Sequence, residues 1–248
     1  MSNKKINLVI PLGGAGSRFS SKGYKEYKPF IEVGSGKSMI RSVIDNLYHQ
    51  DLNFIFIINE GQISREDFIY HLRYDPIDPI VFTTPTLTDG PASSVLLAKE
   101  KIDNESPLIV INCDQIIKDF SLNNLVKFAE ITEADGILGT FISRSDKNSY
   151  VGIDRNGEIS TVVEKDVISD IATNGLHYWK KGSDFVSSAE RMISKDDRTN
   201  GEFYIAPTYN YLIDDGKRVL PYFYNLHFPI GTPGDLEKYV KIFQNGGL

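Results

Sequence analysis

The fold of this chain is decided near its start, by the stretch Ile6-Asn7-Leu8-Val9-Ile10-Pro11-Leu12-Gly13-Gly14-Ala15-Gly16-Ser17-Arg18. Residues 6–12 are mostly apolar and glycines follow at once, which is typical of a buried strand that enters a turn. A strand, a glycine turn and a helix together form an anion site, because glycine lets backbone N–H groups approach oxygens and helix N-termini favour negative charge. The stretch therefore predicts an α/β unit that holds an anion beyond its first strand.

Alternating patterns continue along the chain. Apolar runs typical of buried strands lie at 54–58, 80–84 and 108–112, and helical spacing marks 38–49, 91–102 and 122–131. This alternation predicts a mostly parallel sheet covered on both faces. The second half is richer in strands, expected at 137–142, 150–154, 159–164 and 219–226, with helices at 183–193, 206–213 and 235–243. No repeat or linker-like stretch interrupts the sequence, so we expect one domain over residues 1–248.

The composition limits the functions open to the chain. Its 248 residues, 41% of them hydrophobic, can bury a full core, and a formal net charge of -6 argues against general nucleic-acid binding. The lone Cys113 excludes an internal disulfide framework and a cysteine-based metal site. No stretch approaches the roughly 20 apolar residues of a membrane helix, and the start lacks the apolar block of a signal peptide. We therefore expect a cytoplasmic protein without a nucleic-acid or membrane partner.

Three interpretations of the glycine loop compete. A dinucleotide-binding fingerprint begins at Gly14-Ala15-Gly16, but its third glycine would fall at Phe19. A P-loop at Gly34-Ser35-Gly36-Lys37-Ser38 lacks its first glycine, because Ile31 occupies that position, and we expect this segment to form the turn into the helix at 38–49. The third interpretation is the phosphate loop of a nucleotidyltransferase.

The residues around the loop resemble the signature of one family. Leu12-Gly13-Gly14-Ala15-Gly16-Ser17-Arg18-Phe19, followed by Lys28-Pro29-Phe30-Ile31-Glu32-Val33, is similar to the signature of the sugar-phosphate nucleotidyltransferases, also called nucleotide-sugar pyrophosphorylases. Each matching segment is common alone, but six of them in the family order make the resemblance specific. The later five are Thr88-Asp89-Gly90-Pro91-Ala92-Ser93-Ser94-Val95, Asn112-Cys113-Asp114-Gln115, Glu164-Lys165, Asn200-Gly201-Glu202-Phe203-Tyr204 and Gly231-Thr232-Pro233-Gly234-Asp235-Leu236.

The resemblance implies a fold and a reaction. The implied fold is α/β, a single Rossmann-like domain with a mostly parallel mixed sheet flanked by helices, plus a smaller β-rich part that binds the acceptor. Residues 1–140 would form a nucleotide-binding half and 141–248 an acceptor-binding half, and we expect no added domain. In the implied reaction an acceptor phosphate oxygen attacks the α-phosphorus of a nucleoside triphosphate and pyrophosphate leaves. Such a reaction depends mainly on positioning and charge neutralisation.

The implied nucleotide site combines the glycine loop with two later segments. Arg18 and Lys28 would be catalytic cations beside the phosphates, since an Arg guanidinium can fork onto phosphate oxygens. Asp114 follows an apolar strand, where ligands of open α/β sheets collect, and a carboxylate there suits Mg²⁺ together with phosphate oxygens. The implied nucleotide contacts are Leu12, Gly13, Gly14, Ala15, Gly16, Ser17, Gly90, Ala92, Ser93 and Asn112.

The implied acceptor site lies in the second half. Lys165 would be a third catalytic residue that binds the acceptor phosphate, and Glu164 would accept hydrogen bonds from acceptor hydroxyls or an amine. For Trp179, ordinary packing is as well supported as a place in the pocket. The four histidines show no metal-ligand spacing and receive no role. The further candidates are Tyr150, Asn174, Gly175, Glu202 and Tyr204.

One position departs from the family pattern. Several members carry a second metal-binding Asp just before the terminal Gly-Thr, where this chain has Pro229. Either Asp114 holds the metal with phosphates and water, or Glu202 or Asp235 substitutes for the missing Asp. A third alternative is a non-catalytic nucleotide-binding sensor. An NAD-type oxidoreductase rests only on the partial glycine pattern.

The end of the glycine loop indicates the base. The ending Gly16-Ser17-Arg18-Phe19 resembles the cytidylyltransferase side of the family, such as choline-phosphate cytidylyltransferases, more than the Gly-Thr-Arg-Leu of many glucose-phosphate enzymes. We therefore favour CTP, followed by UTP or dTTP. The acceptor would be a sugar phosphate, a polyol phosphate or another phosphorylated metabolite of surface-polysaccharide synthesis, as in capsule formation. Many members of the family assemble, which allows a homo-oligomer.

Overall fold

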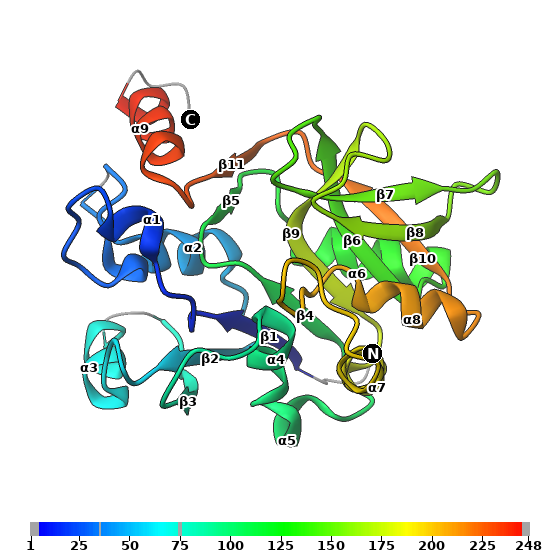
Figure 1. The fold of residues 1–248 in the computed structure, drawn as a ribbon, viewed down its shortest axis with the longest axis horizontal. Coiled ribbons are helices and arrows are strands. Elements are labelled where there is room, and N and C mark those ends of the chain that lie inside the picture. Colours follow the sequence, from blue (N-terminus) through cyan, green and yellow to red (C-terminus); the bar gives the residue numbers. More distant parts are fainter. Residues whose placement is uncertain (1–4, 35, 74–75, 245–248) are drawn as a thin grey trace.

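A mixed β-sheet forms the centre of the computed structural model, which describes residues 5–34, 36–73 and 76–244 (Figure 1). Within these ranges nine strands join the sheet: β1 (Ile6–Pro11), β2 (Leu52–Asn59), β3 (Ile80–Thr84), β4 (Leu108–Ile111), β6 (Gly136–Ile142), β7 (Ser149–Ile153), β8 (Ile159–Glu164), β9 (Ile171–Trp179) and β10 (Val219–Phe223). The main order is β10-β6-β9-β4-β1-β2-β3, and the β7–β8 pair joins β9. A two-stranded sheet pairs β5 (Gln115–Ile117) with β11 (His227–Pro229).

Strand direction is parallel over most of the main sheet. β1 runs parallel to β2 and β4, β2 to β3, and β10 to β6. β9 alone on this path runs antiparallel to both of its neighbours, β4 and β6. The predicted α/β fold with a mostly parallel mixed sheet is thereby confirmed.

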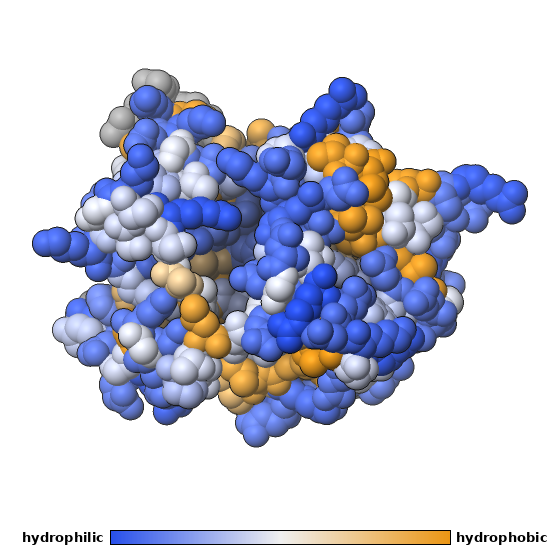
Figure 2. All heavy atoms as spheres, viewed as in Figure 1, coloured by the Kyte–Doolittle hydropathy of each residue, from blue (hydrophilic) through white to orange (hydrophobic). Residues whose placement is uncertain are grey.

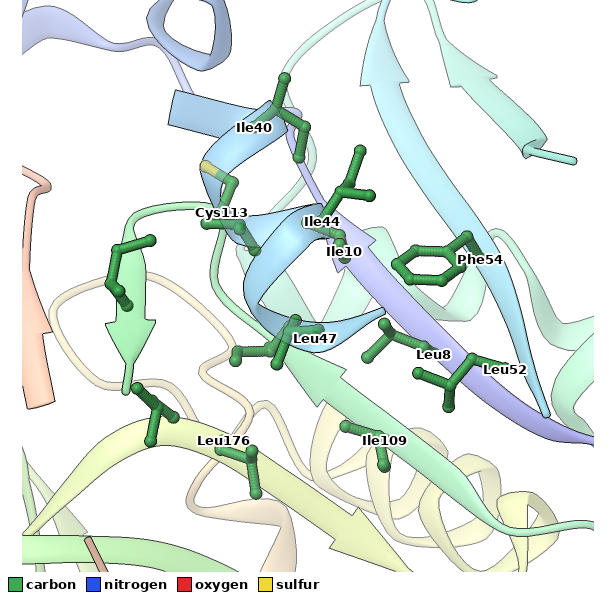
Figure 3. Packing of buried hydrophobic residues seen from close by; sticks show 14 of the residues in the cluster. Leu8, Ile10, Ile40, Ile44, Leu47, Leu52, Phe54, Ile109, Cys113 and Leu176 are labelled. Atoms are coloured by element: carbon green, nitrogen blue, oxygen red, sulfur yellow. The ribbon is translucent and has the colours of Figure 1, made fainter. Parts of the chain in front are cut away.

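Helices cover both faces of the sheet. Successive residues of a strand point to opposite faces, so a strand that is apolar throughout needs helices on both sides to bury its side chains. Leu8 and Ile10 of β1 belong to one core cluster with residues of α2 (Met39–Leu47), α3 (Arg65–His71) and α6 (Leu122–Thr132). Figure 3 shows part of this cluster, with α2 packed over the strands. Val9 belongs to the opposite cluster, with α4 (Pro91–Leu96), α5 (Lys99–Ile102), α7 (Gly182–Ser194) and α8 (Thr208–Asp214). The remaining helices are α1 (Ser17–Ser20), the 3₁₀ helix η1 (Lys28–Phe30) and α9 (Pro233–Gln244).

The segment weighed above as a P-loop is the turn before α2. The Ser38 hydroxyl caps this helix by accepting a hydrogen bond from the backbone N–H of Arg41 at 3.3 Å. Lys37 Nζ lies 2.7 Å from Asp45 Oδ2, at the surface of the same helix. Ser35 lies outside the described residues. The expected turn is confirmed, and its polar groups start a helix instead of surrounding a phosphate.

Several elements differ from the expectations. The helix expected at 91–102 is two shorter helices, α4 and α5, and the strand expected at 219–226 ends at Phe223. The short elements α3, β5 and β11 were not predicted, nor was β9, which lies in the middle of the sheet. In the part of the chain that the structure describes, no helix has the length and apolar character needed to cross a membrane.

Candidate active site

The sheet changes its direction of winding between β1 and β4, where open α/β sheets bind ligands. The chain runs from β1 outward through β2 to β3 and then crosses back to β4 on the other side of β1. The segments that follow β1 and β4 therefore meet. They enclose a space of about 230 Å³, here called the loop pocket, which is lined by Pro11, Leu12, Gly14, Gly16, Lys28, Pro29, Asn112, Cys113 and Asp114.

The glycine loop, of which Gly14 and Gly16 line this pocket, carries unused backbone donors. Among the described residues, none accepts a hydrogen bond from the backbone N–H groups of residues 13–16. The helix that follows, α1, is only one turn long, so its dipole is smaller than the sequence pattern led us to expect. The amides of the loop itself are therefore the donors available to an anion.

Lys28 and Asp114 form an ion pair at the loop pocket, with Lys28 Nζ 2.6 Å from Asp114 Oδ2. Burial alone lowers the pKa of Lys28, but the Asp114 carboxylate outweighs it, so the pKa is raised and the ammonium stays charged. Burial also raises the pKa of the adjacent Cys113 thiol to about 11, which keeps it protonated at neutral pH. The pocket therefore combines a fixed cation, a carboxylate and free amides.

The small β5–β11 sheet supplies the other neighbours of Asp114. Gln115 Nε2 donates to Asp114 Oδ1 at 3.4 Å, and His227 Nε2 hydrogen-bonds to Gln115 Oε1. The carboxylate also lies against Gly231, where a Cβ atom would stand 2.4 Å from Asp114 Oδ2. Pro229 pairs with Gln115 in this sheet, and its side chain offers no ligand atom. Asp114 is thus the only carboxylate among the described residues that line the loop pocket.

A Mg²⁺ ion fits this site only together with substrate oxygens. Mg²⁺ is commonly held by one or two carboxylates plus phosphate oxygens and water. Asp114 supplies one carboxylate, and the described residues contain no group of three or more His, Cys, Asp or Glu side chains arranged to hold a metal. Asp235 lines the neighbouring cavity, but its Oδ2 already accepts a hydrogen bond from Thr232 Oγ1 at 2.6 Å. The donor set therefore suits a metal that arrives with phosphates.

A larger cavity of about 660 Å³, here called the central cavity, shares Asn112 and Asp114 with the loop pocket. Figure 2 shows a hollow on this face of the molecule, bordered mostly by hydrophilic residues. Arg18 enters its wall from the first half of the chain. The predicted acceptor residues on the wall are Glu164, Lys165, Asn174, Gly175, Glu202 and Tyr204. The structure therefore brings these side chains together with the end of the glycine loop.

Glu164 and Lys165, at the end of β8, lie in contrasting surroundings. The Ser149 hydroxyl donates to Glu164, yet burial raises the pKa of Glu164 by more than Ser149 and Lys165 lower it. Lys165 has a φ of 58°, which is uncommon for a residue with a side chain, and its ammonium contacts the Tyr204 hydroxyl. A carboxyl and an ammonium side by side suit a ligand that carries both hydroxyl and phosphate groups.

Asn174 is a buried polar residue in the wall of the central cavity. The residue is 2% exposed, and its Nδ2 has no hydrogen-bond partner among the described residues. Buried donors are normally paired with protein or water, so an unpaired amide in a cavity wall is a candidate polar group of the site. Gly139 makes room for the side chain, because a Cβ atom there would stand 2.4 Å from Asn174 Oδ1. A Cβ atom at Gly175 would stand 2.7 Å from Asn112 Nδ2, so the two halves of the chain are in contact there.

Residues 8–239 match the family model described as nucleotidyl transferase. The chain belongs to the nucleotidyl transferase family. It is 25% identical over 236 residues to the bifunctional protein GlmU of Brevibacillus brevis, in a match that covers 88% of this chain. Only 46% of GlmU is covered, so the chain spans about half the length of this curated relative. The resemblance inferred from the six motifs is thereby confirmed.

Solved structures share the fold of this family member. A nucleoside-diphosphate-sugar pyrophosphorylase from Vibrio cholerae RC9 superposes with a TM-score of 0.82 at 24% identity, over 94% of this chain and 99% of that one. The inositol-1-phosphate CTP transferase from T. maritima gives a TM-score of 0.74 at 16% identity, over 99% and 98% of the two chains. At these identities the likeness establishes the fold.

Some predicted contacts are not among the residues that line the two cavities. Tyr150 is fully buried and its hydroxyl donates to the carbonyl of Ser145 at 2.8 Å, so the structure places it in the interior and not on the acceptor wall. Trp179 is also fully buried, with its ring centroid 4.6 Å from that of Tyr209. The remaining residues that line neither cavity are Gly13, Ala15, Ser17, Gly90, Ala92 and Ser93.

Other residues of the cavity wall were not anticipated. Gln115 and His227 contact each other beside Asp114. Both lie in the small sheet that contains Pro229, and the departure from the family pattern at Pro229 was the signal in the sequence that could have drawn attention to them. Burial lowers the pKa of His227 to about 4, so its ring is neutral at pH 7. His177 of β9 lines the cavity and is 4% exposed. No local signal distinguishes it, because β9 itself was not predicted.

Proposed function

We propose that this family member transfers a nucleotidyl group from a nucleoside triphosphate to a small phosphorylated metabolite and releases pyrophosphate. The observation that supports this most is the wall shared by the two cavities. Asn112 and Asp114 line both the loop pocket, with its free amides, and the central cavity, with its polar side chains. A triphosphate held by the loop would therefore have room for a second substrate beside its phosphates.

The proposed chemistry asks little covalent help from the protein. A phosphate oxygen of the acceptor bonds to the α-phosphorus, and the bond from this phosphorus to the pyrophosphate oxygen breaks, with its electron pair leaving on pyrophosphate. Arg18, Lys28 and the amides of residues 13–16 would stabilise the negative charge that develops. Lys165 would hold the acceptor phosphate, while Glu164 and Asn174 would bind acceptor hydroxyls and so fix its orientation.

Asp114 would hold Mg²⁺ together with the phosphate oxygens of the nucleotide. The metal, when bound, would add positive charge where the reacting phosphate accumulates negative charge. Lys28 now contacts Asp114 Oδ2, so it would turn from the carboxylate toward the phosphates as nucleotide and metal enter. Pro229 leaves this arrangement with one protein carboxylate.

The substrates are proposed from the end of the glycine loop and from the polar cavity wall. We favour CTP, then UTP or dTTP, because of the Ser17-Arg18-Phe19 ending. A UDP-glucose pyrophosphorylase and an inositol-1-phosphate CTP transferase both share the fold, so the fold alone leaves the base open. The polar wall suits a hydroxyl-bearing phosphate, and we place the reaction in the cytoplasm, in the supply of surface-polysaccharide precursors. A homo-oligomer remains part of this proposal on the family resemblance.

Thermal shift with CTP, UTP, dTTP and NAD(P) in the presence of Mg²⁺ tests the nucleotide site. A ligand at 100 times its Kd stabilises the folded state by about 2.7 kcal/mol, which raises the melting temperature measurably. A panel of phosphorylated metabolites is then screened for pyrophosphate release with the best triphosphate. Arg18→Ala should weaken both signals. Absence of triphosphate binding, with Arg18→Ala unchanged, contradicts the proposal, and a shift with NAD(P) alone supports the oxidoreductase alternative.

A non-catalytic nucleotide sensor is the second candidate, and Pro229 in place of an Asp is the observation that favours it. This candidate predicts nucleotide binding without turnover for every acceptor. Mass spectrometry of the reaction mixture separates the two candidates, because a single nucleotidylated product excludes a sensor without activity.

A further inference from the structure

The segment between α7 and α8 passes along the start of α4, where Figure 1 shows the gold chain beside the green helix. Two backbone hydrogen bonds join them: the Phe203 N–H donates to the Asp89 carbonyl at 2.8 Å, and the Ala92 N–H donates to the Phe203 carbonyl at 3.0 Å. Gly90 lies between these bonds with a φ of 122°, and a Cβ atom there would stand 2.5 Å from the Phe203 nitrogen. The contact therefore excludes every side chain at position 90.

The joined segments belong to different parts of the proposed site. Residues 88–93 are the expected nucleoside side, and Pro91 among them lines the central cavity. On the other segment Glu202 and Tyr204 line the cavity, while Phe203 between them is 1% exposed. Phe203 therefore fixes the backbone from which two acceptor-side residues project.

A tight turn leads into this backbone. Thr199 and Glu202 exchange both N–H···O=C hydrogen bonds at 3.0 Å, and the two residues between them, Asn200 and Gly201, have φ values of 50° and 82°. Positive φ at both central residues is the two-residue hairpin turn that an Asn-Gly pair favours. The position of Glu202 thus depends on how the whole turn is oriented against residues 88–92.

Arg198 holds that orientation through its guanidinium. Its NH1 donates to the Gly201 carbonyl at 3.0 Å, and its NH2 donates to Asp89 Oδ2 at 3.1 Å. Its Nε donates to Asp196 Oδ1 at 2.6 Å, and its Cζ lies 4.1 Å from the centre of the Phe203 ring. The planar fork of an Arg can make these directional bonds at the same time, which a Lys ammonium does not reproduce.

We propose that Arg198 is a positioning residue that couples the nucleotide side of the site to Glu202 and Tyr204 on the acceptor side. This inference rests on the proposed function. The carboxylate partners, Asp89 and Asp196, are 67% and 75% exposed, and exposed ion pairs add little stability. Arg198 therefore acts on the geometry of the turn more than on the free energy of unfolding.

The coupling has a thermodynamic consequence. A nucleotide that orders residues 88–92 also orders the Phe203 backbone and the turn before it, so Glu202 and Tyr204 are pre-positioned for the acceptor. Because such coupling is reciprocal, acceptor binding strengthens nucleotide binding by the same factor. Removal of the Arg198 fork should weaken this mutual effect while each half-site keeps its own contacts.

The test compares Arg198→Met and Arg198→Lys with Arg191→Met. Arg191 is a matched control, because it pairs with Asp215 at 2.7 Å and its Cζ lies 5.3 Å from the Tyr211 ring centre, away from the central cavity. With the acceptor found in the screen, Arg198→Met should raise the acceptor KM by about 10-fold and change the nucleotide Kd, measured without acceptor, by less than about twofold. Arg198→Lys should recover little of the loss, and Arg191→Met should change neither constant.

Hydrogen exchange of the Phe203 and Ala92 amides gives a second readout that needs no turnover. In the unaltered protein the triphosphate with the largest thermal shift should slow exchange at both amides, and Arg198→Met should abolish this slowing. Asp89→Ala, which removes the acceptor of the same bond from the exposed side, keeps the test valid should an Arg198 variant not fold.

The outcomes separate this inference from the proposed function. Nucleotide binding with unchanged acceptor KM and unchanged exchange in Arg198→Met overturns the inference and leaves the proposed function intact. A fall in melting temperature with equal changes in both substrates' constants also overturns it, because that result marks a merely structural role. If no triphosphate binds, the proposed function fails. Faster exchange at Phe203 in Arg198→Met, but not in Arg191→Met, then still supports the local role of Arg198.

Discussion

The part of the molecule up to β4 and the part from β6 onward surround the two adjoining cavities, but they contribute to them in different ways. The first part ends its parallel strands in loops, and its contribution is a row of backbone amides with the cations Arg18 and Lys28. The second part contributes side chains of varied chemistry, a carboxyl at Glu164, an ammonium at Lys165 and an amide at Asn174. One side is built mainly from backbone and the other mainly from side chains.

The two parts are therefore suited to recognise different groups of the substrates. Phosphate oxygens are the same in every nucleoside triphosphate, and backbone amides bind them without relying on particular side chains. Hydroxyl patterns differ from one metabolite to another, so their recognition needs donors and acceptors on specific side chains. We therefore expect changes in the first part to affect all substrate pairs alike, and changes in the second to affect the acceptor.

The largest effect is expected from Lys28→Met, which removes the fixed cation of the first part. Loss of one preorganised electrostatic group costs about 10²–10³-fold in rate, so kcat/KM should fall by that factor for every acceptor. Lys37→Met is the matched control, because Lys37 pairs with Asp45 at the surface and exposed pairs contribute little. Pyrophosphate release per folded molecule measures both variants. Equal losses would contradict a special role for Lys28.

The first part could be predicted from the sequence because its signals are local. Apolar runs followed by glycines or by Asn112-Cys113-Asp114 marked β1 and β4. Parallel strands joined by helices then leave few arrangements, and these place the two loops together. The sequence alone therefore sufficed to predict that the glycine loop, Lys28 and Asp114 lie close together.

The second part was predicted less well because its central strand is irregular. Asn174 and Gly175 interrupt the apolar pattern of β9, Gly175 has a φ of 84°, and the pairing with β6 shifts register nearby. Its partners β4 and β6 are antiparallel and distant in sequence, which no local pattern records. The same irregularity places polar Asn174 at the cavity, so the feature that concealed the strand also builds the acceptor side.

The second prediction concerns His177, which belongs to this irregular strand. Burial lowers its pKa from 6.5 to about 4, so the folded protein binds the proton less readily than the unfolded chain does. The contribution of neutral His177 to the free energy of unfolding is therefore fully present above pH 6.5 and is lost as the pH falls toward 4. The total loss well below pH 4 is about 3 kcal/mol. Urea unfolding from pH 7.5 to 4.5 should show a reduced pH dependence in His177→Phe.

His227 shares this behaviour, because burial lowers its pKa to about 4 as well. His177→Phe should therefore remove only part of the pH dependence, and the double variant with His227→Gln should remove most of it. His71→Gln, at an exposed position of α3, is the control for a histidine substitution outside both cavities. An unchanged slope in His177→Phe would show that His177 does not stay neutral in the folded protein.

The third prediction tests the backbone character of the first part with Gly14→Ala. A Cβ atom at Gly14 meets no other atom within 4 Å, so the fold should tolerate the methyl group. Gly14 lines the loop pocket, however, and one added methyl in a binding pocket typically changes affinity by about 10-fold. Calorimetry should show weaker binding of every triphosphate by a similar factor. Gly234→Ala, at an equally open position on α9, should bind as the unaltered chain does.

The smallest effect is expected from Glu164→Gln. This substitution should slightly stabilise the fold but weaken binding of the acceptor. Burial raises the pKa of Glu164, so the folded state disfavours the charged carboxylate that the unfolded chain carries at pH 7. Stability is therefore highest below the ordinary pKa of Glu and declines as the pH rises past it. The neutral Gln can still accept the Ser149 hydrogen bond, so Glu164→Gln should raise the melting temperature at pH 7 by at most about 2 °C and lose this gain near pH 4.

The same substitution separates the two parts in binding. Gln adds donors where Glu164 offers only acceptors, so the acceptor KM should rise while the nucleotide Kd stays constant. Glu190→Gln is the control, because Glu190 pairs with Lys99 at an exposed site outside the central cavity. An equal change in the nucleotide Kd and the acceptor KM would contradict this expectation. It would show that side chains of the second part also reach the nucleotide, so that the division between backbone and side-chain recognition does not hold at Glu164.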